Sequence, residues 1–162
     1  MMFLLNLACG TDYRESDSNI HWLNVDISPN IRTDLIVNAF KLPYPFPDDH
    51  FDGVLAQDFL EHVPHQLFDA DARPLDRDGF LLVMDEIWRI LKPGAKLEAR
   101  FPSPFHPNSL IDPTHTRSLF PQTFLWYLCK EGDFSFYTTR HWQDLQFEER
   151  EDGNIVVLIT KS

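Results

Sequence analysis

The sequence predicts an α/β fold with a doubly wound, mostly parallel β-sheet and a C-terminal antiparallel hairpin. Three observations support this class. Short apolar runs alternate with polar segments over the first hundred residues, as is typical of parallel strands that are buried on both faces. One amphipathic helix pattern precedes the fifth of these runs. Alternating apolar residues on both sides of Asp152-Gly153 indicate a terminal hairpin.

The chain is organised around its first two predicted strands. Residues 3–8 form an apolar run that leads into the small residues 8–10, and residues 22–27 form a second run that closes on Asp26. Small residues let the backbone turn tightly and approach a ligand. An acid at the tip of the next strand can accept hydrogen bonds from a ribose diol. These two strand ends therefore predict a nucleotide-type cofactor site.

The other elements follow from local pattern. The polar segment 11–19 has room for a turn or two of helix, and three prolines exclude regular structure between residues 41 and 48. Apolar residues at helical spacing predict a helix from about 79 to 91. It should end at Lys92-Pro93-Gly94, because proline cannot continue a helix and glycine permits a left-handed exit. We also expect strands at 34–37, 51–57 and 96–101, a helix at 121–130, and hairpin strands around 145–147 and 155–159.

Residues 102–118 are predicted to form a long loop. They are rich in Pro, His, Ser and Asp and show no apolar period, and loops of this length in a compact domain usually have a function. The segment follows the fifth strand, so it should leave the sheet at the carboxyl edge, where ligands bind in open α/β sheets. We therefore predict that it is a substrate lid.

Composition narrows the class of protein. The 162 residues predict a single domain, 1–162, with 43% hydrophobic residues and a formal net charge of −11. Such an acidic surface argues against direct nucleic-acid binding. No apolar run has membrane-spanning length, and the first run lacks the positive residue of a secretion signal. Two cysteines, Cys9 and Cys129, offer no disulfide framework, so we expect a cytoplasmic protein.

Several motifs stand in order along residues 3 to 101. They are Leu5-Asn6-Leu7-Ala8-Cys9-Gly10-Thr11, Asn24-Val25-Asp26, Asn38-Ala39 with Leu42-Pro43, Phe51-Asp52-Gly53-Val54 through Leu60-Glu61-His62-Val63, and Arg89-Ile90-Leu91-Lys92-Pro93-Gly94. In this order the chain resembles the class I S-adenosylmethionine-dependent methyltransferases. The resemblance implies a Rossmann-like fold, S-adenosylmethionine as cofactor, and methyl transfer to a small-molecule or otherwise soluble acceptor.

The resemblance also implies roles for individual residues. Residues 8–10 would wrap the methionine portion of the cofactor, Asp26 would hold the ribose hydroxyls, and Asn38 with the Ala39 backbone would reach the adenine edge. Gln57 and Asp58 would lie beside the sulfonium, with His62 just behind. The implied cofactor-binding set is Asn6, Ala8, Cys9, Gly10, Asp26, Ile27, Asn38, Ala39, Gln57 and Asp58.

The chain departs from the family pattern in its first motif. Ala8 stands where the family usually has its first glycine, Asp12 stands where another glycine is common, and the spacer before Asp26 is short. Either a compressed first helix binds the cofactor normally, or the cofactor site is degraded. The retained Asp26 favours binding. Many relatives cover the cofactor with an N-terminal helix. This sequence has no residues before the first predicted strand that could form one, so we expect residues 102–117 to supply the lid.

The candidate catalytic residues are His115, His62 and Asp58. The unperturbed pKa of a histidine side chain lies near neutrality, so His115 would suit a general base on a substrate hydroxyl or amine. The alternative is that Asp112 and His115 only hold the loop in place. His62 and His65 have ligand spacing, but no cysteine or carboxylate set completes a site, so no metal is predicted.

Two functions of another class stay open. The chain would then be a non-catalytic cofactor-binding or scaffold protein, or a fold relative that uses the same cofactor for another reaction. The oligomeric state is not predicted.

Overall fold

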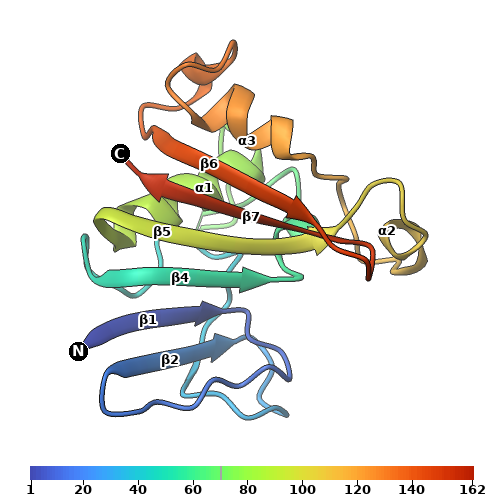
Figure 1. Ribbon diagram of the computed structural model, residues 1–162. Coiled ribbons are helices and arrows are strands. Elements are labelled where there is room, and N and C mark those ends of the chain that lie inside the picture. Colours follow the sequence, from blue (N-terminus) through green and yellow to red (C-terminus); the bar gives the residue numbers. More distant parts are fainter. Residues whose placement is uncertain (70) are drawn as a thin grey trace.

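The computed structural model describes residues 1–69 and 71–162 and contains one seven-stranded sheet (Figure 1). The spatial order is β3-β2-β1-β4-β5-β7-β6. β7 runs antiparallel to both of its neighbours, β5 and β6, and the other paired strands are parallel. The predicted Rossmann-like, mostly parallel sheet with a C-terminal hairpin is therefore confirmed. The strands are β1 (Met2–Leu7), β2 (Ile20–Asp26), β3 (Leu35–Ile36), β4 (Phe51–Gln57), β5 (Leu91–Pro102), β6 (Trp142–Glu149) and β7 (Asn154–Lys161).

The order of the strands creates a switch point. From β1 the chain winds outward through β2 and β3, and then returns to the other side of β1 with β4. In open α/β sheets the connections leave opposite ways at such a point, and a crevice opens outside the carboxyl ends of the strands. The crevice of this sheet therefore lies at the ends of β1 and β4.

The helices are α1 (Gly79–Ile90), α2 (Asn108–Ile111) and α3 (Pro121–Leu128), with single 3₁₀ turns η1 (Leu60–His62) and η2 (Ser135–Tyr137). α1 begins where the Asp78 side chain accepts a hydrogen bond from the Phe80 amide. It stops at Ile90, two residues before the expected Lys92-Pro93-Gly94, because β5 already begins at Leu91. α2 lies within the segment predicted to be a loop, and α3 is two residues shorter than expected.

The core lies between one face of the sheet and two helices. α1 lies behind the strands in Figure 1, and α3 lies beside β6. The Phe124 ring of α3 meets Phe80 of α1 edge-on at 5.5 Å between centroids and stacks on Phe101 of β5 at 5.7 Å. Both helices therefore cover the same face of the sheet, and Phe124 joins them to it.

The opposite face carries no helix among residues 1–69 and 71–162. The segment 11–19 was expected to hold a turn or two of helix, but it has none. Side chains explain the difference, since Asn24 bonds both the amide and the carbonyl of Arg14, and Asn6 donates to the Asp12 carbonyl. These bonds satisfy the backbone in an extended conformation that competes with a helix.

The terminal hairpin turns at the predicted residues. Gly153 has a φ of +83°, which favours glycine, and its amide bonds the Arg150 carbonyl. Ile155, Val157 and Ile159 of β7 are buried. The hairpin thus completes the covered face of the sheet.

We predict that Phe124→Ala lowers the free energy of unfolding by about 3–5 kcal/mol, because Phe124 is fully buried between two helices and the sheet. Urea denaturation measures this value. Phe136→Ala is the matched control, since the Phe136 side chain is 74% exposed and its loss should change stability little. Equal losses in the two variants would contradict the described core.

Candidate functional site

The carboxyl ends of β1, β2 and β4 meet in a cavity of about 420 Å³. Its wall contains eight residues that the sequence singled out, together with four that it did not. The predicted ones are Ala8, Gly10, Asp26, Ile27, Asn38, Ala39, Asp58 and His62, and the others are Val37, Phe40, Phe59 and Thr114. The predicted residues are thus brought to one place at the switch point.

The turn after β1 contains two residues in the left-handed region. Ala8 has a φ of +53° and Gly10 a φ of +54°. Glycine adopts this region freely, whereas a residue with a Cβ is strained in it. The geometry therefore explains why a glycine is usual at position 8, and it shows that Ala8 makes the same turn at a cost.

Asp26 joins the ends of β1 and β2. Its Oδ2 accepts a hydrogen bond from the Gly10 amide at 3.0 Å, and its Oδ1 accepts one from the Ser28 amide at 2.9 Å. A carboxylate has about four lone-pair sites. Asp26 is therefore fixed in orientation and keeps capacity to accept further hydrogen bonds.

Asn6, Cys9 and Gln57 do not line this cavity. Asn6 is buried, and its side-chain amide donates to the Asp12 carbonyl and to the Asn24 side-chain oxygen. Asn6 therefore stabilises the turn without lining the cavity. Burial raises the pKa of the Cys9 thiol to about 11, which keeps it protonated and unreactive. Gln57 faces Arg14, at 3.5 Å from its guanidinium.

One end of the cavity is apolar. Phe40 and Phe59 stack with 5.8 Å between ring centroids, and Val37 and Ile27 also line the wall. Asn38 turns the chain there, because its Oδ1 accepts from the Phe40 amide. Phe40 directly follows the predicted Asn38-Ala39 turn in the sequence. Its position next to this turn was the signal that could have identified it as a lining residue.

Asp58 forms an ion pair that the sequence did not reveal. Its carboxylate binds the Arg100 guanidinium, and its amide donates to the Arg100 carbonyl at 2.8 Å. The side-chain hydrogen bond to the Asp58 carboxylate raises the pKa of Arg100 above its usual range. Asp58 also has a φ of +50°. Strained residues of this kind cluster at functional sites.

The segment after β5 is bonded to the chain beyond β4. The amides of Thr116 and Arg117 donate to the Glu61 carbonyl, and the Thr116 hydroxyl donates to the Val63 carbonyl at 2.7 Å. These bonds place Thr114 at the cavity and His115 against η1. The segment is therefore positioned by backbone hydrogen bonds and is not an unattached loop.

His115, His62 and Glu61 form a cluster behind the cavity. One ligand atom from each lies within 4.8 Å of the other two, and the two imidazole centroids are 4.7 Å apart. Burial raises the pKa of the Glu61 carboxyl to about 8. His65 lies outside this cluster and binds Asp78 at 2.9 Å.

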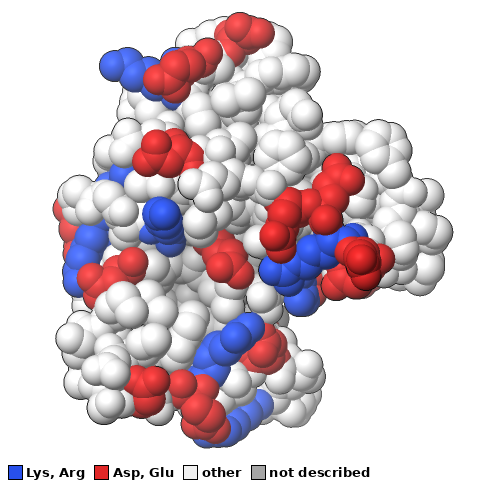
Figure 2. Space-filling view, in the orientation of Figure 1, with Lys and Arg blue, Asp and Glu red and all other residues white. Residues whose placement is uncertain are grey.

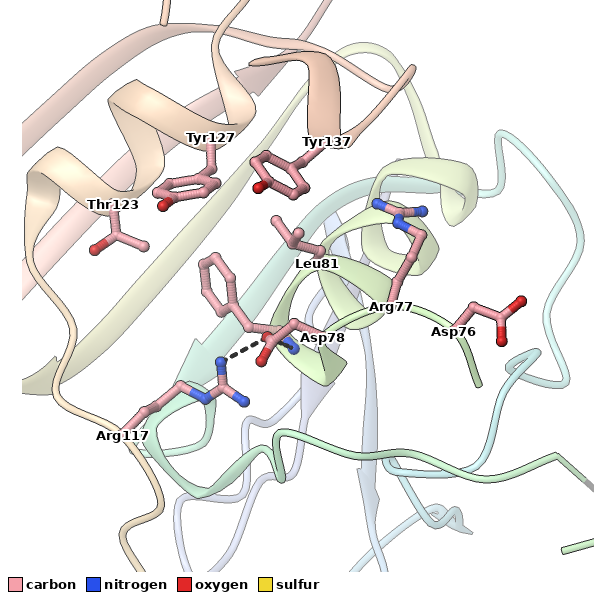
Figure 3. A pocket seen from close by; sticks show the side chains of 9 residues that line it. Asp76, Arg77, Asp78, Leu81, Arg117, Thr123, Tyr127 and Tyr137 are labelled. Atoms are coloured by element: carbon pink, nitrogen blue, oxygen red, sulfur yellow. Dashed lines mark hydrogen bonds and ion pairs between the residues drawn. The ribbon is translucent and has the colours of Figure 1, made fainter. Parts of the chain in front are cut away.

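A second cavity of about 620 Å³ lies between α1, α3 and η2 (Figure 3). Tyr127, Tyr137 and Leu81 give it an apolar wall, and Arg117 pairs with Asp78 at 2.8 Å at its edge. It shares no lining residue with the cavity at the strand ends, and no predicted site residue lines it.

Residues 5–98, more than half of the chain, match the family described as methyltransferase domain. The chain therefore belongs to this family, the class I methyltransferases, whose cofactor is S-adenosylmethionine. The resemblance inferred from the sequence is confirmed. No curated protein matches the chain significantly.

Solved structures share the fold at low sequence identity. A SAM-dependent methyltransferase from Archaeoglobus fulgidus aligns with a TM-score of 0.67 and 15% identity, over 99% of this chain and 86% of the other. A methyltransferase complexed with the Trm112 methyltransferase activator of Haloferax volcanii gives 0.64 and 16%, over 99% and 82%. The [4+2]-cyclase SpnF gives 0.61 and 16%, over 99% and 74%.

The surface carries charges of both signs. Figure 2 shows Lys and Arg side chains interspersed with Asp and Glu on the face without helices, and no continuous basic area is visible there. Within residues 1–69 and 71–162, no helix combines the length and the apolar character needed to cross a bilayer.

We predict that Ala8→Gly leaves the free energy of unfolding unchanged or raises it by up to about 1 kcal/mol, because glycine relieves the left-handed strain. Urea denaturation checks this. Ala56→Gly in β4 is the control, since Ala56 is fully buried in an ordinary strand and the same change should destabilise the chain. A matching loss at both positions would contradict the strain.

Proposed function

We propose that the chain transfers a methyl group from S-adenosylmethionine to a small or soluble acceptor, with the cofactor bound in the cavity at the ends of β1, β2 and β4. The arrangement of Asp26 carries this proposal. Its carboxylate is held against the Gly10 turn at the switch point of the sheet and keeps free lone pairs. This is where open α/β sheets bind nucleotide-type ligands.

The lining residues fit the parts of the cofactor. Asp26 would accept hydrogen bonds from the two ribose hydroxyls, and the turn at Ala8 and Gly10 would lie along the methionine portion. The adenine would enter the apolar end beside Phe40, with Asn38 at its edge. Asn6 and Cys9 would act indirectly, by supporting the turn.

The bound cofactor supplies an electrophilic methyl group on a positively charged sulfur. The protein would hold acceptor and methyl in line and exclude water, which accounts for most of the catalysis in such a displacement. Asp58 and His62 line the cavity and would face the reacting end. Because Asp58 is paired with Arg100, its carboxylate would help to orient the bound ligands and would not accept a proton.

The acceptor side would be formed by residues 102–118, which act as the lid. Thr114 of this segment lines the cavity, and His115 lies next to His62. The Nδ1 atom of His115 bonds the Ser109 carbonyl, so Nε2 would be its proton acceptor. We propose that direct nucleic-acid binding does not contribute, given the net charge of −11. The buried free thiols of Cys9 and Cys129 suit a cytoplasmic location.

Product analysis separates this function from its alternatives. The assay incubates the chain with S-adenosylmethionine and a panel of hydroxyl, amine and thiol acceptors, and measures S-adenosylhomocysteine. A non-catalytic scaffold, alone or with a partner subunit, would bind S-adenosylmethionine without forming S-adenosylhomocysteine. A fold relative such as the SpnF cyclase would act on a substrate without using up the methyl group.

We predict that Asp26→Ala weakens S-adenosylhomocysteine binding about tenfold or more, because charge-assisted hydrogen bonds to the ribose are lost. Isothermal titration calorimetry measures the affinity. Asp76→Ala is the control, since Asp76 lines the second cavity and is exposed. If Asp26→Ala left the affinity unchanged and Asp76→Ala weakened it, the proposed site would be contradicted. The cofactor would then be assigned to the second cavity.

A further inference from the structure

Three side chains from two distant segments converge behind the cofactor cavity. Glu61 and His62 belong to η1, and His115 follows α2 in the segment after β5. A carboxylate oxygen of Glu61 and one ring nitrogen from each histidine all lie within 4.8 Å of one another. The cofactor contacts proposed above use His62 only as part of the wall, so the convergence needs its own explanation.

Hydrogen bonds settle which nitrogen of each imidazole carries the proton. The Thr114 hydroxyl donates its only proton to Asp112 at 2.6 Å, so His62 Nδ1 must donate to the Thr114 oxygen at 2.9 Å. His115 Nδ1 lies 3.0 Å from the Ser109 carbonyl, which can only accept. In the neutral imidazoles both Nε2 atoms therefore carry lone pairs and no proton.

Glu61 adds two more acceptors to the same place. Its side chain is only 2% exposed, and neither carboxylate oxygen has a hydrogen-bond donor among the residues that the structure describes. A buried carboxylate without a partner is strongly unfavourable. Lone pairs from two imidazoles and one carboxylate thus face one another, and the group that would satisfy all three is a cation.

We propose that Glu61, His62 and His115 bind a divalent transition-metal ion of the Zn²⁺ type through one carboxylate oxygen and the two Nε2 atoms. Imidazole nitrogens favour zinc and its first-row neighbours over Mg²⁺ and Ca²⁺, which prefer oxygen. Metal-bound histidines usually donate their other ring N–H to a carbonyl or a polar side chain. The Ser109 carbonyl and Thr114 hydroxyl would fill this role.

The cluster needs a small contraction to bind such an ion. Bonds of about 2.0–2.1 Å in a tetrahedral site separate the ligand atoms by roughly 3.3 Å. The present separations of up to 4.8 Å would close by side-chain rotation of His62 and His115, both of which are only partly buried. Three protein ligands leave a fourth position open, as in catalytic zinc sites.

The position of the cluster indicates what the open site would do, and this step rests on the proposed function. His62 and Thr114 line the cofactor cavity. An acceptor hydroxyl bound to the metal there would lose its proton more easily, because a divalent ion lowers the pKa of a coordinated oxygen. The inferred acceptor class is therefore a hydroxyl compound bound through oxygen.

An arrangement without metal is the alternative. The Glu61 carboxyl, whose pKa burial raises to about 8, would then be protonated and uncharged, and the Nε2 atom of His115 would keep its lone pair. In that case His115 would be the general base candidate considered above and would bind no metal. Titration with a metal ion distinguishes the two.

The test titrates the chelator-treated 162-residue chain with Co²⁺, followed by visible absorption and by calorimetry, and then displaces Co²⁺ with Zn²⁺. We expect one equivalent to bind, with the intense d–d bands of a four- or five-coordinate site. His62→Ala, His115→Ala and Glu61→Gln should each weaken binding by about tenfold to a hundredfold or more. His65→Ala is the matched control, because His65 lies nearby but bonds Asp78.

Two further measurements keep the outcome decisive. If a variant fails to fold by circular dichroism, X-ray absorption of the zinc-loaded wild-type chain replaces it and should show two imidazoles at about 2.0–2.1 Å. The proposal would be overturned if the wild-type chain bound no Co²⁺, or if folded variants of Glu61, His62 and His115 bound it as well as the wild type. A zinc coordination shell without imidazole would also overturn it. S-adenosylhomocysteine affinity of the metal-free chain tests the cofactor site separately, so either hypothesis can fail alone.

Discussion

The hydrogen bond from the Gly10 amide to the Asp26 carboxylate ties the turn after β1 to the side chain at the end of β2, and the proposed cofactor site depends on it. Without it, the turn at Ala8 would be bonded to β2 through the backbone, by the Cys9 amide and the Val25 carbonyl, and the Asp26 carboxylate would keep only the Ser28 amide as a donor. The bond fixes the carboxylate before any ligand arrives, which reduces the entropy lost on binding. The Ser28 amide completes this preorganisation from the other side.

The second constraint is the attachment of the segment after β5 to η1. The Glu61 carbonyl accepts the amides of Thr116 and Arg117, while the Glu61 side chain turns inward to His62 and His115. One short turn thus supports both the wall of the cavity at the strand ends and the candidate metal cluster. A change in residues 102–118 would therefore be transmitted directly to the wall of this cavity.

The sheet and most of the residues that line the cavity at the strand ends were predictable, because both depend on local pattern. Apolar runs indicated the strands, and an acid at the end of β2 indicated Asp26. The irregular segment 11–19 was not predictable, since it depends on side-chain bonds from Asn24 in another element. The link between Glu61 and His115 spans more than fifty residues. Spacing within one segment therefore could not show that they meet.

We propose that S-adenosylmethionine chemistry takes place at the ends of β1, β2 and β4. The most direct measurement is a ¹H–¹⁵N correlation spectrum of the chain titrated with S-adenosylhomocysteine. We expect large, saturable shifts for the amides of Gly10, Ile27 and Ala39, with little change for Phe80 and Tyr127 at the second cavity. Shifts confined to Phe80 and Tyr127, or no saturable shifts, would contradict it.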